Sequence, residues 1–168
     1  VLDQQTRRML ADPRADALIS NFFNQWLELR TLLTQRLSRE IFPDFDENLR
    51  QGLLRETELF LRSQVRDDRS VPELLTANYT FVNDRVARHY GIPNVSGPQF
   101  TRVTLPDSRR SGLLGHGSIL TLTSYATRTS PVRRGKWVLD TFFGTPVPPA
   151  PAGLPARAED GNGKATSI

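Results

Sequence analysis

Apolar residues recur at intervals of three and four along much of the chain, which is the spacing of one helix face. The first such stretch predicts a helix over residues 2–11. A second helix should start at Asp12-Pro13, where Asp is a favoured N-cap and Pro a favoured first residue, and end at about Leu29. Aromatic residues at helical spacing usually pack in a core, so we expect one side of this helix to be buried: Ile19, Phe22, Trp26 and Leu29.

A longer helix is predicted from Asp44 or Asp46 to Val65. Glu56 falls close to the apolar side of this helix. A carboxylate there is either a buried, paired structural group or a functional acid, and we expect a structural pair with one of the many arginines. The residues that mark this inner side are Leu49, Leu53, Phe60 and Gln64.

Capping residues mark three further helices. The sequence Ser-Val-Pro-Glu at 70–73 predicts a short helix with Ser70 as its N-cap. Asn83 should cap a helix that ends at Gly91, because glycine readily adopts the left-handed conformation that closes a helix. The Ser-Pro pair at the start of 130–144 predicts the last helix.

One segment favours a strand, and another is ambiguous. Residues 100–105 alternate apolar and polar side chains, which is typical of a strand, and this strand needs a partner that the pattern does not identify. Residues 109–124 suit either a buried helix or a strand. Within them, Gly115 and Gly117 bracket His116 and would allow another backbone or a ligand to approach closely.

These elements predict a mainly α fold, an irregular helical bundle with one short strand or hairpin and a proline-rich C-terminal extension. We divide the chain into a helical domain at 1–108, a second helical block at 109–145 and a proline-rich linker or strap at 146–168. Because the sequence opens without Met and stops in a polar, glycine-containing stretch, we expect an internal piece of a larger protein.

Charge and composition narrow the function classes. No stretch approaches the roughly 18 apolar residues of a transmembrane helix. The chain is arginine-rich, with 20 of its 22 basic residues being Arg, and residues 101–140 hold seven basic and two acidic groups. That region is either a solvated, salt-bridged surface or a contact for phosphate, an acidic partner or an acidic domain of the same protein.

The chemistry-bearing residues form no recognisable catalytic or metal motif. The absence of cysteine excludes disulfides, thiol nucleophiles, zinc-thiolate sites and covalent haem attachment within these residues. Only two histidines are present, and we interpret His89 as a surface or capping residue. No metal-binding or cofactor-binding residue is assigned. The polar residues to test for a shared site are Glu56, Tyr79, Asn83, His116, Arg128, Ser130 and Arg134.

Several segments resemble a known family. NFFNQWLELR (21–30), FPDFDENLR (42–50), the Glu-Thr pair at 56–57 and ANYTFVNDRVARHYGIP (77–93) resemble the planctomycete cytochrome-associated domain of unknown function numbered 1592. Asn78 departs from the acidic residue of that pattern, which leaves no charge role at this position. RRSGLLGHGSILTLTSYATRTSPVRRGKWVLDTFFGTPVPPAP (109–151) resembles the domain that usually follows it, numbered 1588.

The resemblance implies a periplasmic or secreted parent protein with further flanking domains. It implies a CxxCH sequence, and hence a c-type haem, in a C-terminal neighbour, with no cofactor in this chain. The partners that we expect are the flanking domains of the same protein and a redox partner. The family has no established activity that could be transferred to these residues.

Three functions follow from these observations. The first is a non-catalytic helical scaffold or docking module of an extracytoplasmic, c-type-cytochrome-associated protein. The second is a domain of an extracytoplasmic enzyme, a hydrolase or oxidoreductase, with a site between the two blocks. The third is nucleic-acid binding through the basic region, and we do not expect nucleic acid as a partner.

Overall fold

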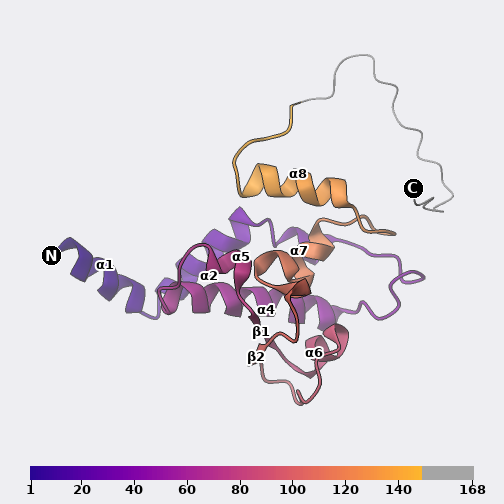
Figure 1. Cartoon of the computed structure of the whole chain (residues 1–168), viewed down its shortest axis with the longest axis horizontal. Helices are drawn as coiled ribbons and strands as arrows, with labels where there is room; N and C mark the ends of the chain where they lie inside the picture. Colours follow the sequence, from indigo (N-terminus) through magenta and orange to yellow (C-terminus); the bar gives the residue numbers. More distant parts are fainter. Residues whose placement is uncertain (149–168) are drawn as a thin grey trace.

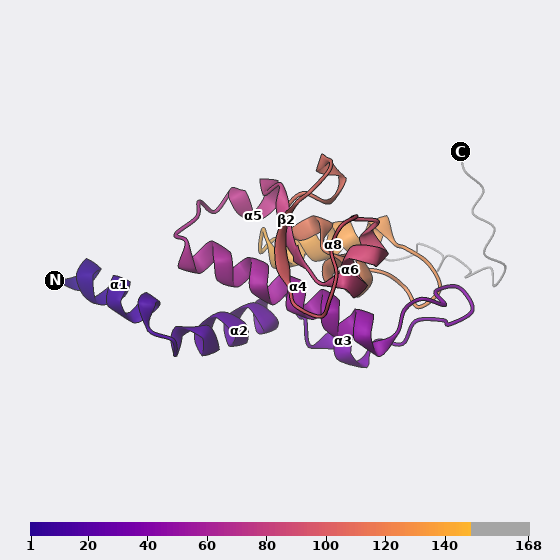
Figure 2. The same cartoon turned by 90° about the horizontal axis from the view of Figure 1, so that it is seen from below.

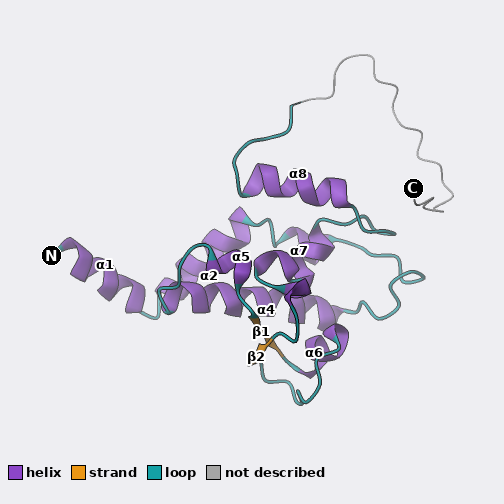
Figure 3. Ribbon diagram, in the orientation of Figure 1, coloured by secondary structure: helices purple, strands orange, loops and turns teal. Residues whose placement is uncertain are grey.

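The computed structural model describes residues 1–148, which form eight α-helices, two 3₁₀ turns and one two-stranded sheet (Figure 1, Figure 3). The mainly α fold with a short strand pair is thereby confirmed. Of the predicted proline-rich extension, residues 149–168 lie outside the described residues. In chain order the elements are α1 (Leu2–Ala11), α2 (Ala15–Trp26), α3 (Thr31–Thr34), α4 (Glu47–Arg66), α5 (Glu73–Thr76), β1 (Tyr79–Val82), α6 (Asp84–Tyr90), β2 (Thr101–Thr104), η1 (Ser108–Arg110), η2 (Leu113–Gly115), α7 (Gly117–Leu122) and α8 (Pro131–Thr141).

The long helix α4 is the element on which the others pack, and it begins where the sequence predicts. Asp46 caps it, because its side chain accepts a hydrogen bond from the Leu49 amide at 2.7 Å. Helices α2, α6 and α7 and strand β1 all lie against it. All four predicted inner residues are buried, and the buried face also includes Gly52, Glu56, Thr57 and Leu61.

The predicted strand at 100–105 forms as β2, and its partner is β1. The two strands are antiparallel, with Tyr79 opposite Thr104 and Val82 opposite Thr101. Helix α6 connects them. Asn83 caps this helix by accepting a hydrogen bond from the Val86 amide at 3.0 Å, and Gly91 closes it at a φ of 70°, as predicted.

The remaining helix boundaries are partly as predicted. Ser130 caps α8 by accepting a hydrogen bond from the Arg133 amide, which confirms the last helix. The prediction for α2 is wrong at both ends: the Asp12 side chain binds the Arg14 amide instead of capping a helix, and Glu28 enters a left-handed conformation at φ 56° after the helix ends. Ser70 makes a turn through its carbonyl instead of capping α5 with its side chain.

The structure corrects the expected burial of Phe22 and resolves the ambiguous segment 109–124. Phe22 was expected in the core but is 53% exposed, and it stacks on Trp26 with ring centroids 5.8 Å apart. The ambiguous segment 109–124 forms the 3₁₀ turns η1 and η2 followed by the short helix α7. Helix α1 extends away from the other elements and buries no residue (Figure 1, Figure 2).

The main hydrophobic core draws on both predicted blocks. Phe60 of α4 and Tyr79 of β1 pack in it with Ile119 of α7 and Trp137 of α8. The indole N–H of Trp26 also donates to the Thr141 carbonyl at 2.9 Å, across 115 residues of sequence. Residues 1–108 and 109–145 therefore share one hydrophobic core. The predicted boundary at residue 108 separates two segments of the sequence that pack together.

Candidate functional site

Glu56 lies inside the protein, on the face of α4 that meets the strand pair. Its side chain is 1% exposed. Thr80 of β1 donates its hydroxyl proton to Oε1 at 2.6 Å, and Tyr90 at the end of α6 donates to Oε2 at 2.5 Å. The expectation of an arginine partner is wrong, because the β1 and α6 hydroxyls occupy both carboxylate oxygens.

Burial controls the protonation of Glu56. Removal from water raises the pKa of this carboxyl to about 7, while the hydrogen bonds from Thr80 and Tyr90 and the charge of Arg110 act in the opposite direction. Burial, with the adjacent carboxylate, also raises the pKa of Tyr90 well above its ordinary value. Tyr90 therefore stays a neutral hydrogen-bond donor to Glu56.

Tyr90 joins Glu56 to the start of α7. Its hydroxyl oxygen accepts the amide proton of Gly117 at 2.8 Å. The Arg110 guanidinium lies over the Tyr90 ring, 4.1 Å from its centroid, and donates to the Gly115 carbonyl at 3.2 Å. A Cβ at Gly117 would lie 2.9 Å from the Tyr90 hydroxyl, so glycine is what permits this approach.

His116 is held beside Glu56 by the next residue of α4, Thr57. The Thr57 hydroxyl lies 3.0 Å from Nδ1 of His116 and 2.6 Å from the Ser118 hydroxyl. Because Thr57 donates its own proton to the Leu53 carbonyl, we assign the imidazole proton to Nδ1, which then donates to Thr57. Nε2 is buried and has no hydrogen-bond partner among residues 1–148.

The environment of His116 favours the neutral imidazole. Burial, with a smaller contribution from the charge of Arg110, lowers the pKa of His116 to about 3. One edge contact with the Phe60 ring, at a centroid distance of 4.8 Å, completes its packing. At neutral pH this histidine carries no charge to offer to a substrate.

Tyr79 packs against Phe60, the residue that also contacts His116. Its ring centroid is 5.6 Å from that of Phe60, and its hydroxyl accepts a hydrogen bond from Gln64 at 2.8 Å. The Arg102 guanidinium covers the ring at 3.6 Å from the centroid. Tyr79 therefore adjoins the Glu56–His116 cluster through an aromatic contact and makes no hydrogen bond to it.

The other four candidate residues have separate local roles. Asn83 and Ser130 are the caps of α6 and α8. Arg128 lies 5.0 Å from the Tyr125 ring centroid in the turn before α8. Arg134 makes a long hydrogen bond, 3.4 Å, to the Thr123 hydroxyl. Of the seven candidate residues, Glu56 and His116 lie in one cluster, and Tyr79 adjoins it by packing. Asn83, Arg128, Ser130 and Arg134 lie outside this cluster.

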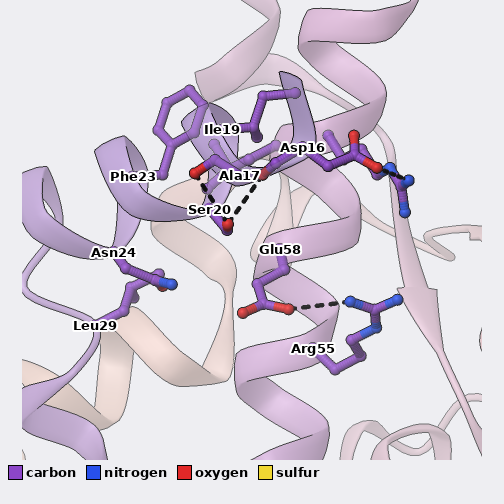
Figure 4. Close-up of a pocket in the computed structure, with 11 residues that line it drawn as sticks. Asp16, Ala17, Ile19, Ser20, Phe23, Asn24, Leu29, Arg55 and Glu58 are labelled. Atoms are coloured by element: carbon purple, nitrogen blue, oxygen red, sulfur yellow. Dashed lines mark hydrogen bonds and ion pairs between the residues drawn. The ribbon is translucent and has the colours of Figure 1, made fainter. Parts of the chain in front are cut away.

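A cavity lies elsewhere, between α2 and α4 (Figure 4). It has a volume of about 320 Å³, an apolar wall that includes Ile19, Phe23 and Leu29, and an ion pair of 3.1 Å between Arg55 and Glu58. A second hollow of about 200 Å³ adjoins it. None of the seven candidate residues lines either space.

Metal ions are held in proteins by groups of ligand side chains, such as His, Asp and Glu. Residues 1–148 contain no group of three or more His, Asp or Glu side chains placed to hold an ion. Among the same residues, no helix combines the length and the apolar character that a membrane crossing requires.

Two protein families match the sequence of this chain. Residues 1–92 match the family described as PSD4, protein of unknown function (DUF1592). The chain belongs to this family. Residues 110–167 match a second family, PSCyt3, protein of unknown function (DUF1588). Both names indicate planctomycete cytochrome-associated domains, which confirms the resemblance found in the sequence. Searches of curated proteins and of solved structures gave no match.

The buried cluster connects the PSD4 and PSCyt3 regions. Glu56, Thr57 and Tyr90 belong to the first, and His116 and Gly117 to the second. Sequence reasoning found the carboxylate and the imidazole but missed the hydroxyls that bind them. The Glu-Thr pair at 56–57 could have indicated that Thr57 belongs to the cluster. The sequence around Tyr90 and Thr80 contains nothing that predicts their hydrogen bonds to Glu56.

Proposed function

We propose that this chain is a non-catalytic helical scaffold module of a larger, extracytoplasmic protein associated with c-type cytochromes. The observation that carries the proposal is the burial of its chemical groups. Glu56 and His116 are each 1% exposed, and they are bound by neighbouring hydroxyls. Neither described cavity reaches them, so a substrate has no described route to the two groups that acid–base chemistry would use.

The chemical reactivity of the two histidines tests this proposal. Diethyl pyrocarbonate acylates accessible imidazoles, and peptide mass spectrometry locates the adduct. His89 is exposed and should react quickly, whereas His116 should stay unmodified until the protein unfolds. Reaction of both histidines at similar rates in the folded protein would contradict the scaffold function.

The cytochrome association supports a docking role beside a haem domain. The family names are compatible with a periplasmic or secreted location and with a c-type haem in a C-terminal neighbour. In the haem-loaded parent protein, deletion of residues 1–145 should therefore change the haem absorption spectrum or the midpoint potential. Identical spectra and potential after the deletion would remove the docking role.

One observation favours an enzyme as the second candidate. A carboxyl group with a pKa of about 7 is well suited to general acid–base catalysis, and Glu56 has this value. An enzyme site between the PSD4 and PSCyt3 regions requires an opening of the cluster to solvent. Rapid acylation of His116 in the same experiment is the outcome that would favour this candidate.

A further inference from the structure

Helix α8 exposes an apolar stripe on its outer side. Val132 is 83% exposed and Leu139 is 39% exposed, and residues seven apart lie on the same side of a helix. Phe143, directly after the helix, is 67% exposed. The opposite side of α8 is anchored by Trp137, which is buried in the main core. Helix α8 therefore packs on the core through Trp137 and leaves the apolar stripe exposed.

Two arginines gather on one tyrosine at the N-terminal end of this stripe. The guanidinium carbons of Arg128 and Arg133 lie 5.0 and 4.9 Å from the ring centroid of Tyr125. The turn that carries them is rigidly hydrogen-bonded: the Tyr125 amide donates to the Arg128 carbonyl at 2.9 Å, and Arg133 donates to the Ser124 carbonyl at 2.8 Å. Both cations therefore lie at the same tyrosine ring.

The charge of these arginines is not compensated locally. The sequence holds no acidic residue between Asp107 and Asp140, and Asp140 pairs with Lys136. Within residues 1–148, Arg128 and Arg133 form no ion pair. The positive end of the α8 dipole points toward the same turn and adds to the potential.

We propose that the α8 face, defined as Tyr125, Arg128, Val132, Arg133, Leu139 and Phe143, docks an amphipathic helix of a partner protein whose apolar stripe is flanked by Asp or Glu. This inference rests on the scaffold function proposed above and names its contact surface. Charge complementarity favours this partner, because the guanidinium groups of Arg128 and Arg133 suit carboxylates and the neighbouring apolar stripe suits apolar side chains. Tyrosine and arginine at the edge of an apolar patch are also typical of protein interfaces.

Two other occupants fit less well. A second copy of the chain, stacked face to face, would bring four uncompensated arginines together. An anionic membrane would attract the arginines, but two exposed apolar side chains on an 11-residue helix, with Phe143 after it, would insert only to a shallow depth.

Fluorescence anisotropy with a labelled synthetic helix tests the proposal on the full chain. The probe carries leucine at helical spacing on one side and glutamate on the others, and a scrambled peptide of the same composition is the reference. The chain should bind the amphipathic probe, with affinity falling at high salt. Charge reversal in R128E/R133E, and loss of the stripe in V132S/F143S, should each weaken binding roughly tenfold or more.

Matched controls are available on α1 and α2. R7E/R8E makes the same charge change on exposed arginines, and L18S/F22S removes two exposed apolar side chains. Both should bind the probe as the unmodified chain does. All four variants alter exposed sites, and circular dichroism verifies that each is folded.

Several outcomes would overturn the docking surface. The first is that the chain binds the scrambled peptide as tightly as the amphipathic probe, and the second is that the α1 and α2 control variants lose as much affinity as the α8 variants. The third is binding to phosphatidylglycerol vesicles without binding to the peptide. The fourth is dimerisation of the chain that V132S/F143S abolishes. None of them bears on the accessibility of His116, so failure of this inference and failure of the scaffold function remain distinguishable.

Discussion

The hydroxyl of Tyr90 lies 2.5 Å from a carboxylate oxygen of Glu56. The Tyr90 hydroxyl oxygen also accepts the amide proton of Gly117 at 2.8 Å, so this one side chain links the interior of the PSD4 region to the first turn of the PSCyt3 helix α7. Since the Glu56 carboxyl is buried, the protonation of this network is tied to folding.

Replacement of Glu56 by Gln should remove a loss of stability that occurs between pH 4.5 and about 7. The pKa of Glu56 is raised to about 7 in the folded protein against an ordinary value of 4.5. The contribution of Glu56 to the free energy of unfolding is therefore fully present below pH 4.5, where the carboxyl is protonated in both states. It is lost as pH rises through 7, by about 3 kcal/mol. Urea unfolding at a series of pH values should show this decline in the difference between the unmodified chain and E56Q, because His116 contributes equally to both. E58Q, on the same helix, is the control and should keep the decline; an unchanged slope in E56Q would contradict the assignment.

His116 should have the opposite pH dependence. Its pKa is lowered to about 3 from 6.5, so the folded state is favoured above pH 6.5 and loses stability as pH falls toward 3. H116Q should show a shallower acid loss than the unmodified chain in the same titration. H89Q should differ less, because His89 is exposed. Parallel acid curves for H116Q and the unmodified chain would show that His116 is not buried as described.

Removal of the Tyr90 hydroxyl should be costly. Y90F leaves the Gly117 amide and one oxygen of Glu56 without their partner, and a buried polar group without a partner costs about 1–3 kcal/mol. The pKa of Glu56 should rise further, which extends the loss of stability linked to this carboxyl to higher pH. Y125F changes an exposed tyrosine and should alter the free energy of unfolding by less than about 0.5 kcal/mol. Equal effects of the two substitutions would argue against the bridge.

Two glycines should respond to alanine in opposite directions. Gly112 has a φ of 61°, and a Cβ there would lie 2.4 Å from the Leu75 carbonyl carbon. G112A should therefore destabilise the chain by about 3 kcal/mol or more. Gly135 lies in exposed α8 with no atom within 4 Å of an added Cβ, and G135A should stabilise by about 0.5–1 kcal/mol. Thermal unfolding measures both, and a stable G112A would contradict the described turn.

Local signals in the sequence were sufficient for much of the fold. Asp46, Asn83 and Ser130 mark helix starts because a cap depends on residues only three positions away. The spacing of apolar residues likewise identified the buried side of α4. The partner of β2 was not predictable in this way, because β1 is separated from it by a helix and a turn-rich segment.

The surroundings of Glu56 depended on distant parts of the chain. Its burial followed from the helical pattern, but its partners lie 24 and 34 residues further along the sequence. The abundance of arginine suggested an ion pair, yet Arg110 contacts the Tyr90 ring and the Gly115 carbonyl instead. A carboxylate on α4 meets whichever donors the tertiary packing brings, and composition does not specify them.

The PSD4 and PSCyt3 regions share one interior, and the two tryptophans report on each region separately. Trp26 lies in the first and Trp137 in the second. In W137F and W26F, each with a single tryptophan, urea unfolding should follow one cooperative transition when tracked by fluorescence and by circular dichroism. Coincident fluorescence and circular dichroism midpoints in each variant are the predicted result. A PSCyt3 region that unfolds at a lower urea concentration than the PSD4 region would contradict the shared interior.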